Sequence, residues 1–197
     1  FVHAHGSSTP ANRVTESDVL DRTAQAFNIF DWPVTAIKSY VGHSMAAASG
    51  DQVISALGTF SYQIIPGIKT INKVADDVNQ ERLEFLLGDR NCEADPMHVA
   101  FINSKGFGGN NASGYIISPQ KVEELLARKY GDDMLADYNE KRIVAMQSAK
   151  TYEEQAERAI LDVTYKFGED QINESDINIS FDGITIPGYA SKIRFDL

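Results

Sequence analysis

The stretch Val34–Ser44, which reads VTAIKSYVGHS, decides the fold class because it passes from a strand through a loop into a helix. Its first part, Val34–Ser39, is rich in β-branched side chains and predicts a strand. Ser44 is a suitable N-cap for an alanine-rich helix expected over Met45–Gln63. Strands that alternate with helices in this way are typical of an α/β layer.

The same alternation continues on both sides of this stretch. Further strands are expected over Phe1–Ala4, Ile64–Ile65, His98–Asn103 and Gly114–Ser118, and a helix over Arg13–Phe27. The polar segment Asn72–Met97 reads as a long surface loop with a helical patch at Arg82–Leu87. We therefore expect residues 1–118 to form one α/β unit.

Composition changes after Ser118, and residues 119–197 are expected to be a mostly helical α+β extension. Pro119 suits the first position of a helix, and a second helix is expected across Tyr152–Tyr165. Alternation around Asp182-Gly183 predicts a hairpin.

Composition excludes several classes of protein. The 197 residues are 43% hydrophobic, which suffices for a globular core. The net charge of −10 argues against a nucleic-acid partner. No apolar run approaches the roughly 18 residues of a membrane span. The single cysteine fits a reducing, cytoplasmic compartment. Because the chain opens at Phe1 inside a strand-like stretch, we expect it to be part of a longer protein.

Three polar, glycine-containing loops each follow a predicted strand: His5–Pro10, Lys38–Ser44 and Asn103–Asn110. Glycine lets a backbone approach a ligand closely, and the loops beyond the carboxyl ends of parallel strands commonly form binding sites. Taken singly, each signal is weak. A histidine in a turn is usually a structural hydrogen-bonding group, and no third ligand at metal spacing accompanies the two histidines, so no metal site is predicted. The glycine-rich loop lacks the ending of a P-loop.

Taken together, the three loops resemble the β-ketoacyl-[acyl-carrier-protein] synthases. That family has a His-Gly-Thr-Ser-Thr-Pro stretch, a Lys-Ser segment with Gly-His ending five residues after the lysine, and an Asn-Ser-x-Gly-Phe-Gly-Gly-x-Asn stretch. The chain matches all three in order, with Lys38 and His43 at the family spacing. The resemblance covers residues 1–118 and implies the carboxy-terminal half of a thiolase-like fold, with a mixed five-stranded sheet and helices.

The resemblance also implies a reaction. A cysteine takes an acyl chain from acyl carrier protein, malonyl-carrier protein loses CO2, and the resulting enolate attacks the acyl thioester. His5 and His43 would stabilise the enolate oxygen, and Lys38 would orient the site electrostatically. Because His43 precedes a predicted helix start, its neutral form is favoured. Substrate-binding positions implied by the family are Thr9, Gly106, Phe107, Gly108 and Gly109, with Phe107 as a gate residue. Glu16 is a structural acidic residue or a solvated helix-start carboxylate.

The nucleophile is missing from this chain. Cys92 lies among acidic residues, which raise a thiol pKa, so we expect an ordinary loop cysteine. The implied partners are acyl carrier protein, the amino-terminal half of the same enzyme and a second copy in a homodimer. No cofactor is expected, because the substrates are carried on the phosphopantetheine of acyl carrier protein. The chain by itself is expected to be inactive in condensation.

Departures from the family pattern indicate a divergent branch. Arg13, Gln52 and Lys105 stand where the family often has aspartate, glutamate and an aromatic residue. Two alternatives remain open: a subunit like a polyketide chain-length factor, and a non-catalytic module that binds acyl carrier protein or an acyl chain. Residues alone do not decide the acyl length or the choice between the fatty-acid and polyketide pathways.

Overall fold

The structure is a computed structural model that describes residues 1–160, 163, 167–169 and 171–195, apart from the side chain of Phe107. The chain forms two compact units, Phe1–Tyr138 and Asn139–Leu197. The predicted boundary after Ser118 rests on a change of composition and stays a prediction.

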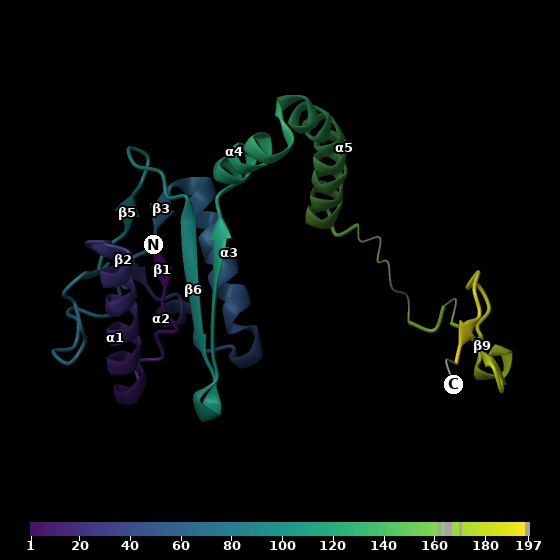
Figure 1. Cartoon of the computed structure of the whole chain (residues 1–197), viewed down its shortest axis with the longest axis horizontal. Coiled ribbons are helices and arrows are strands. Elements are labelled where there is room, and N and C mark those ends of the chain that lie inside the picture. Colours follow the sequence, from purple (N-terminus) through teal and green to yellow (C-terminus); the bar gives the residue numbers. More distant parts are fainter. Residues whose placement is uncertain (161–162, 164–166, 170, 196–197) are drawn as a thin grey trace. The chain divides into compact units, whose positions relative to one another are not determined.

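A five-stranded mixed sheet forms the centre of the first unit, as predicted (Figure 1). Its order is β4-β2-β1-β6-β7, in which the first four strands are parallel and β7 runs antiparallel to β6. The strands are β1 (Val2–His3), β2 (Trp32–Thr35), β4 (Leu83–Phe85), β6 (Val99–Lys105) and β7 (Asn111–Ile117).

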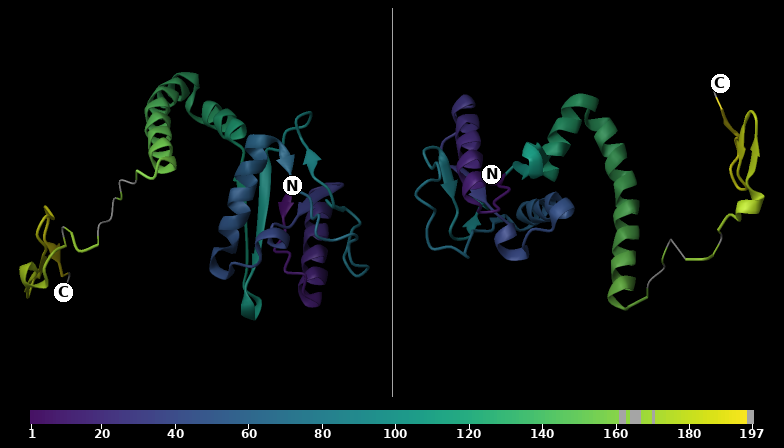
Figure 2. Two further views of the ribbon diagram at one scale, coloured as in Figure 1. Left: turned by 180° about the vertical axis from the view of Figure 1, so that it is seen from behind. Right: turned by 90° about the horizontal axis from the view of Figure 1, so that it is seen from below.

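Two helices cover opposite faces of this sheet, α1 (Pro10–Ala26) and α3 (Ala48–Tyr62) (Figures 1 and 2). The reason lies in the alternation of side chains along a strand. One core contains Val2 from β1 with Leu20, Ala24 and other α1-side residues, and the other contains Phe1 with Ala56 and Phe60 of α3. Phe1, just before β1, and Val2, the first residue of β1, thus point into different cores.

The remaining elements of the first unit are short, apart from one helix. They are α2 (Lys38–Val41), the 3-10 turns η1 (Met45–Ala47) and η2 (Phe107–Gly109), the paired strands β3 (Ile64–Ile65) and β5 (Arg90–Asn91), and helix α4 (Pro119–Tyr130). Ser118 caps α4 by accepting a hydrogen bond from Lys121 N–H at 3.3 Å.

Three sequence predictions in this unit were wrong. Ser44 does not cap the helix predicted over Met45–Gln63, because α3 begins at Ala48 after the 3-10 turn η1 and no side chain caps it. The strand predicted over Val34–Ser39 ends at Thr35, because Ser39 N–H and Tyr40 N–H turn back to the carbonyls of Ala36 and Ile37. The helical patch predicted at Arg82–Leu87 is the edge strand β4, whose buried Leu83 packs in the α1-side core. Pairing with β2 decides that conformation, and a short apolar run does not reveal it.

Helix α5 (Asp132–Glu157) begins before the unit boundary at Tyr138 and continues into the second unit, which also contains a small antiparallel sheet. That sheet contains β8 (Asn178–Ser180), β9 (Gly183–Thr185) and β10 (Ile193–Arg194), and the 3-10 turn η3 (Glu174–Asp176) comes before it. The turn between β8 and β9 holds Asp182, where sequence alternation places a hairpin turn. The helix expected across Tyr152–Tyr165 is the end of α5; residues 161, 162 and 164–166 lie outside the described ones.

None of the helices among the described residues combines the length and apolar character that crossing a bilayer requires.

Candidate active site

The three predicted loops meet at the carboxyl ends of neighbouring strands. β1 ends two residues before His5, β2 ends three residues before Lys38, and β6 ends at Lys105. These strands are adjacent in the order β2-β1-β6, so parallel pairing brings the loops to one edge of the sheet (Figure 1).

The two histidines lie in contact. The ring centroids of His5 and His43 are 5.2 Å apart, with an interplanar angle of 83°. His5 is buried, whereas His43 is exposed between α2 and η1. The protein therefore encloses the His5 side chain, whereas the His43 side chain remains accessible to a ligand.

Backbone hydrogen bonds assign the tautomer of both rings. Lys105 N–H donates to His5 Nδ1 at 3.1 Å, and Met45 N–H donates to His43 Nδ1 at 3.1 Å. A ring nitrogen that accepts a hydrogen bond carries no proton, so each neutral ring holds its proton on Nε2. The site thus contains two adjacent Nε2–H donors.

His5 is held in its neutral form. Burial lowers the pKa of His5, and the charges of Lys38, His43 and Lys105 lower it further, against an opposing effect of Glu16. A neutral imidazole donates one hydrogen bond without bringing a net charge into the site. This protonation state suits a hydrogen-bond donor at neutral pH.

Lys38 is buried at the start of α2, with its Nζ 3.4 Å from His5 Nδ1. Burial lowers the pKa of Lys38, and the nearby carboxylates of Glu16 and Asp51 oppose that effect. Because Lys38 Nζ lies this close to the His5 ring, the charge of Lys38 acts on His5 electrostatically.

The Glu16 carboxylate is buried and accepts hydrogen bonds from four N–H groups. Of the two interpretations offered by the sequence, this is the structural acidic residue and not the solvated carboxylate. Its Oε1 accepts from His5 N–H at 2.7 Å and from Asn103 Nδ2 at 2.6 Å. Its Oε2 accepts from Gly6 N–H and Asn12 Nδ2, both at 3.1 Å. One carboxylate of α1 therefore ties the first loop to β6.

Asn103 and Gln52 belong to the same network, and sequence reasoning gave neither a role. Asn103 Oδ1 accepts from Ser113 Oγ at 3.0 Å, which frees its amide nitrogen for Glu16. Gln52 is buried on α3 and donates to carbonyls of β1 and β6. Asn103 stands in the third motif, which is the signal that marks it. For Gln52 the sequence signal is weaker: it is a glutamine where the family often has glutamate.

The glycine-rich loop joins β6 to β7. Gly106 N–H donates to Asn110 O at 2.7 Å, and Gly108 and Gly109 adopt φ values of 77° and 82°, which favour glycine. Lys105 N–H brings the start of this loop to His5. The side chain of Phe107, the predicted gate residue, lies outside what the structure describes.

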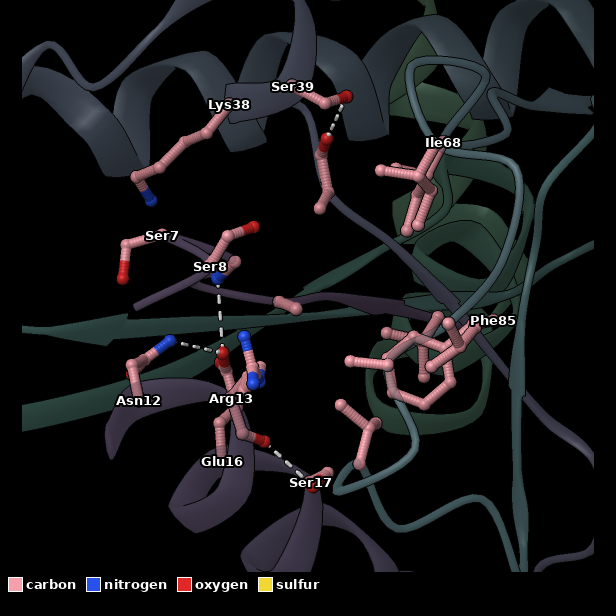
Figure 3. Close-up of a pocket in the computed structure, with 18 of the residues that line it drawn as sticks. Ser7, Ser8, Asn12, Arg13, Glu16, Ser17, Lys38, Ser39, Ile68 and Phe85 are labelled. Carbon is pink, nitrogen blue, oxygen red and sulfur yellow. Dashed lines mark hydrogen bonds between the residues drawn. The ribbon is translucent and has the colours of Figure 1, made fainter. Parts of the chain in front are cut away.

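A cavity of about 680 Å³ opens beside Lys38 and His43 (Figure 3). Polar groups from the first loop and α1, among them Ser7 and the exposed Thr9, line one part of it. Figure 3 shows the apolar side chains of Ile68 and Phe85 at the end opposite Lys38. The volume falls in the range of small-molecule sites.

Cys92 lies apart from this network. It is buried in the α3-side core, and its Sγ lies 3.7 Å from Arg90 O. Burial is the main reason why the pKa of the Cys92 thiol is raised, and the charge of Asp95 raises it further. The acidic neighbours named from the sequence therefore matter less than burial. Such a thiol is a poor nucleophile.

Among the residues that the structure describes, no three His, Cys, Asp or Glu side chains gather into a group able to hold a metal ion.

Comparisons with known proteins support the family resemblance and the fold. The family described as "Beta-ketoacyl synthase, C-terminal domain" matches residues 1–72. The β-ketoacyl-[acyl-carrier-protein] synthase FabY of Pseudomonas aeruginosa is 55% identical over 196 residues, which cover 99% of this chain and 31% of that protein. The 3-oxoacyl-[acyl-carrier-protein] synthase 2 of Vibrio harveyi is 34% identical over 57% of this chain and 26% of its own length.

A crystal structure of ketosynthase FabY from P. aeruginosa is similar over 100% of this chain and 31% of its own, with a TM-score of 0.83 and 54% identity. The chain therefore spans less than a third of the length of these relatives.

Proposed function

Because this chain belongs to the β-ketoacyl synthase family and has its thiolase-like carboxy-terminal architecture, we propose that it supplies the two-histidine part of a condensing site. The parent enzyme would be a 3-oxoacyl-[acyl-carrier-protein] synthase of fatty-acid biosynthesis. The nucleophilic cysteine would come from an amino-terminal half outside these 197 residues. The chain alone would then be inactive in condensation.

In the proposed reaction, malonyl-carrier protein loses CO2 when the bond between its carboxylate carbon and its α-carbon breaks. The electron pair of that bond forms an enolate, whose oxygen gains negative charge. His5 and His43 donate their Nε2–H groups to that oxygen. The enolate carbon then attacks the acyl-cysteine carbonyl, and the cysteine thiolate leaves. No cofactor is needed, because both substrates arrive as thioesters on the phosphopantetheine of acyl carrier protein.

The observation that carries the proposal is the pair of contacting imidazoles, each with Nδ1 already occupied by a backbone N–H. Fixed donors aimed at developing negative charge lower a barrier by about 3 kcal/mol each, provided that they need no reorganisation. Lys38 would keep His5 neutral by its charge, and Glu16 would hold the backbone of His5 in place. Thr9, which lines the cavity, would line the approach of the thioester arm, and the family resemblance assigns the glycine loop to the same approach.

The test is decarboxylation of malonyl-carrier protein by the gene product that contains this chain. We expect His5→Ala and His43→Ala each to lower the rate by roughly 100-fold or more, because each removes one donor. His98→Ala is the matched control, since His98 precedes β6 at the end of that strand opposite Lys105, and its Nδ1 lies 3.4 Å from Ser118 Oγ. Equal effects of all three substitutions would contradict the proposal.

The origin of the nucleophile has its own test. Cys92→Ala in the same gene product is expected to leave condensation intact, because Cys92 is buried in the core and its thiol pKa is raised. Loss of acyl transfer with an intact fold would instead make Cys92 the nucleophile. Carrier-protein binding without any decarboxylation would favour the non-catalytic module.

A further inference from the structure

Gln52 joins the two strands that carry His5 and the glycine loop. Its side chain is fully buried on α3, and its Nε2 lies 3.0 Å from Ala4 O and 3.1 Å from Asn103 O. A third carbonyl, that of His3, lies farther away at 3.4 Å. Because an amide nitrogen carries two hydrogens, Gln52 Nε2 can donate one hydrogen bond to the carbonyl of Ala4 and one to the carbonyl of Asn103.

The two strands need this bridge because their own pairing stops there. The register of β1 and β6 ends at His3↔Ile102. One residue later, Ala4 N–H bonds to Thr35 O of the other neighbouring strand, and Asn103 pairs with Ser113 of β7. The next N–H groups beyond the register are used elsewhere, that of His5 by Glu16 and that of Lys105 by His5 Nδ1. Gln52 instead supplies a donor to the carbonyls of Ala4 and Asn103.

The separation of the strand ends that Gln52 joins determines the hydrogen bond between Lys105 N–H and His5 Nδ1. His5 follows Ala4 directly, and Lys105, whose N–H donates to His5 Nδ1 at 3.1 Å, lies two residues after Asn103. Movement of one strand end away from the other would lengthen that hydrogen bond. A longer bond would leave Nδ1 with the longer contact to Lys38 Nζ, at 3.4 Å, and the proton would be confined to Nε2 less firmly.

We propose that Gln52 is a positioning residue that fixes the Nε2–H tautomer of His5 by clamping the carboxyl ends of β1 and β6. The importance of this tautomer for catalysis rests on the proposed function, whereas the clamp itself does not. Only the nitrogen of the amide is used, since Gln52 Oε1 has no hydrogen-bond partner among the described residues. A glutamate at this position would place an oxygen against the carbonyls and could not act as the same clamp.

The test is nuclear magnetic resonance of the gene product labelled with ¹⁵N-histidine, with His5 assigned from the signals that His5→Gln removes. In the native protein we expect His5 as a single Nε2–H tautomer. Gln52→Met keeps the length of the side chain but removes both donors, so we expect a mixture of tautomers. Thr59→Val is the control, because Thr59 is also buried on α3 and its hydroxyl bonds no described residue.

A folded Gln52→Met protein that keeps His5 as the pure Nε2–H tautomer would overturn the proposal. If Gln52→Met does not fold, Gln52→Asn replaces it; its shorter amide cannot reach both carbonyls at once, and the same mixture is expected. Failure of both variants to fold would make Gln52 a purely structural residue and would also overturn the proposal.

Kinetics separate this inference from the proposed function. If His5 is a catalytic donor, Gln52→Met should lower kcat for malonyl-carrier decarboxylation roughly tenfold to 100-fold with little change in KM, because the donor is misplaced while binding groups remain. A native protein without decarboxylation, but with the expected tautomer change in Gln52→Met, would refute the function and leave the clamp standing.

Discussion

Glu16→Gln turns one oxygen of a buried carboxylate into an amide nitrogen and leaves the shape of the side chain almost unchanged. The carboxylate accepts two hydrogen bonds at each oxygen. The glutamine oxygen is expected at the more buried position, where His5 N–H and Asn103 Nδ2 donate. The new NH2 group then faces Gly6 N–H and Asn12 Nδ2, which are both donors.

The cost follows from these partners. Asn12 adapts by turning its amide over, but the backbone N–H of Gly6 cannot, so one partly buried donor loses its acceptor at about 1–3 kcal/mol. The two bonds that remain lose their charge assistance, which is worth about 0.5–1 kcal/mol each. We therefore expect Glu16→Gln to lower the free energy of unfolding by about 3 kcal/mol.

Urea unfolding of the 197-residue chain measures this loss through Trp32. Trp32 is the only tryptophan, and it packs against Phe101 in the first unit with ring centroids 5.7 Å apart. Asp18→Asn is the matched control on the same helix, because it removes an exposed ion pair with Arg22 and should cost less than about 0.5 kcal/mol. A loss below about 1 kcal/mol for Glu16→Gln would refute the assignment of Glu16 as a buried acceptor.

Three further predictions concern the first unit. Burial is the main cause that lowers the pKa of His3 to about 4, so the unfolded chain binds a proton there that the folded chain does not. Stability should therefore fall as pH drops from about 6.5 to 4, and His3→Leu should remove on the order of 3 kcal/mol of that fall in acid denaturation. Lys38→Met should raise the pKa of His5 in a histidine titration, because the Lys38 charge lowers it; an unchanged pKa would contradict the contact. Gly67→Ala should lower the melting temperature, because a Cβ there would overlap the backbone of Gly88, whereas Gly88→Ala meets open space and serves as the control.

The positions of the functional loops were predictable because each follows a locally recognisable strand. His5, Lys38 and the glycine loop come after β1, β2 and β6, and parallel strands of one sheet end at the same edge. The edge strand β4 was missed because its three residues pair only with β2, and nothing in a three-residue run distinguishes a strand from a helical turn.

The sequence by itself determined the alternation of the main strands and helices around the site, the three loops and the family resemblance, because these depend on side-chain periodicity and on residue types at short spacing. The tertiary structure alone decided the network behind the histidines. Glu16 meets Asn103 across 87 positions, and Gln52 meets the carbonyls of Ala4 and Asn103 across 48 and 51. A buried polar atom must find its partners wherever folding places them, and chain spacing does not encode which distant N–H or carbonyl that will be.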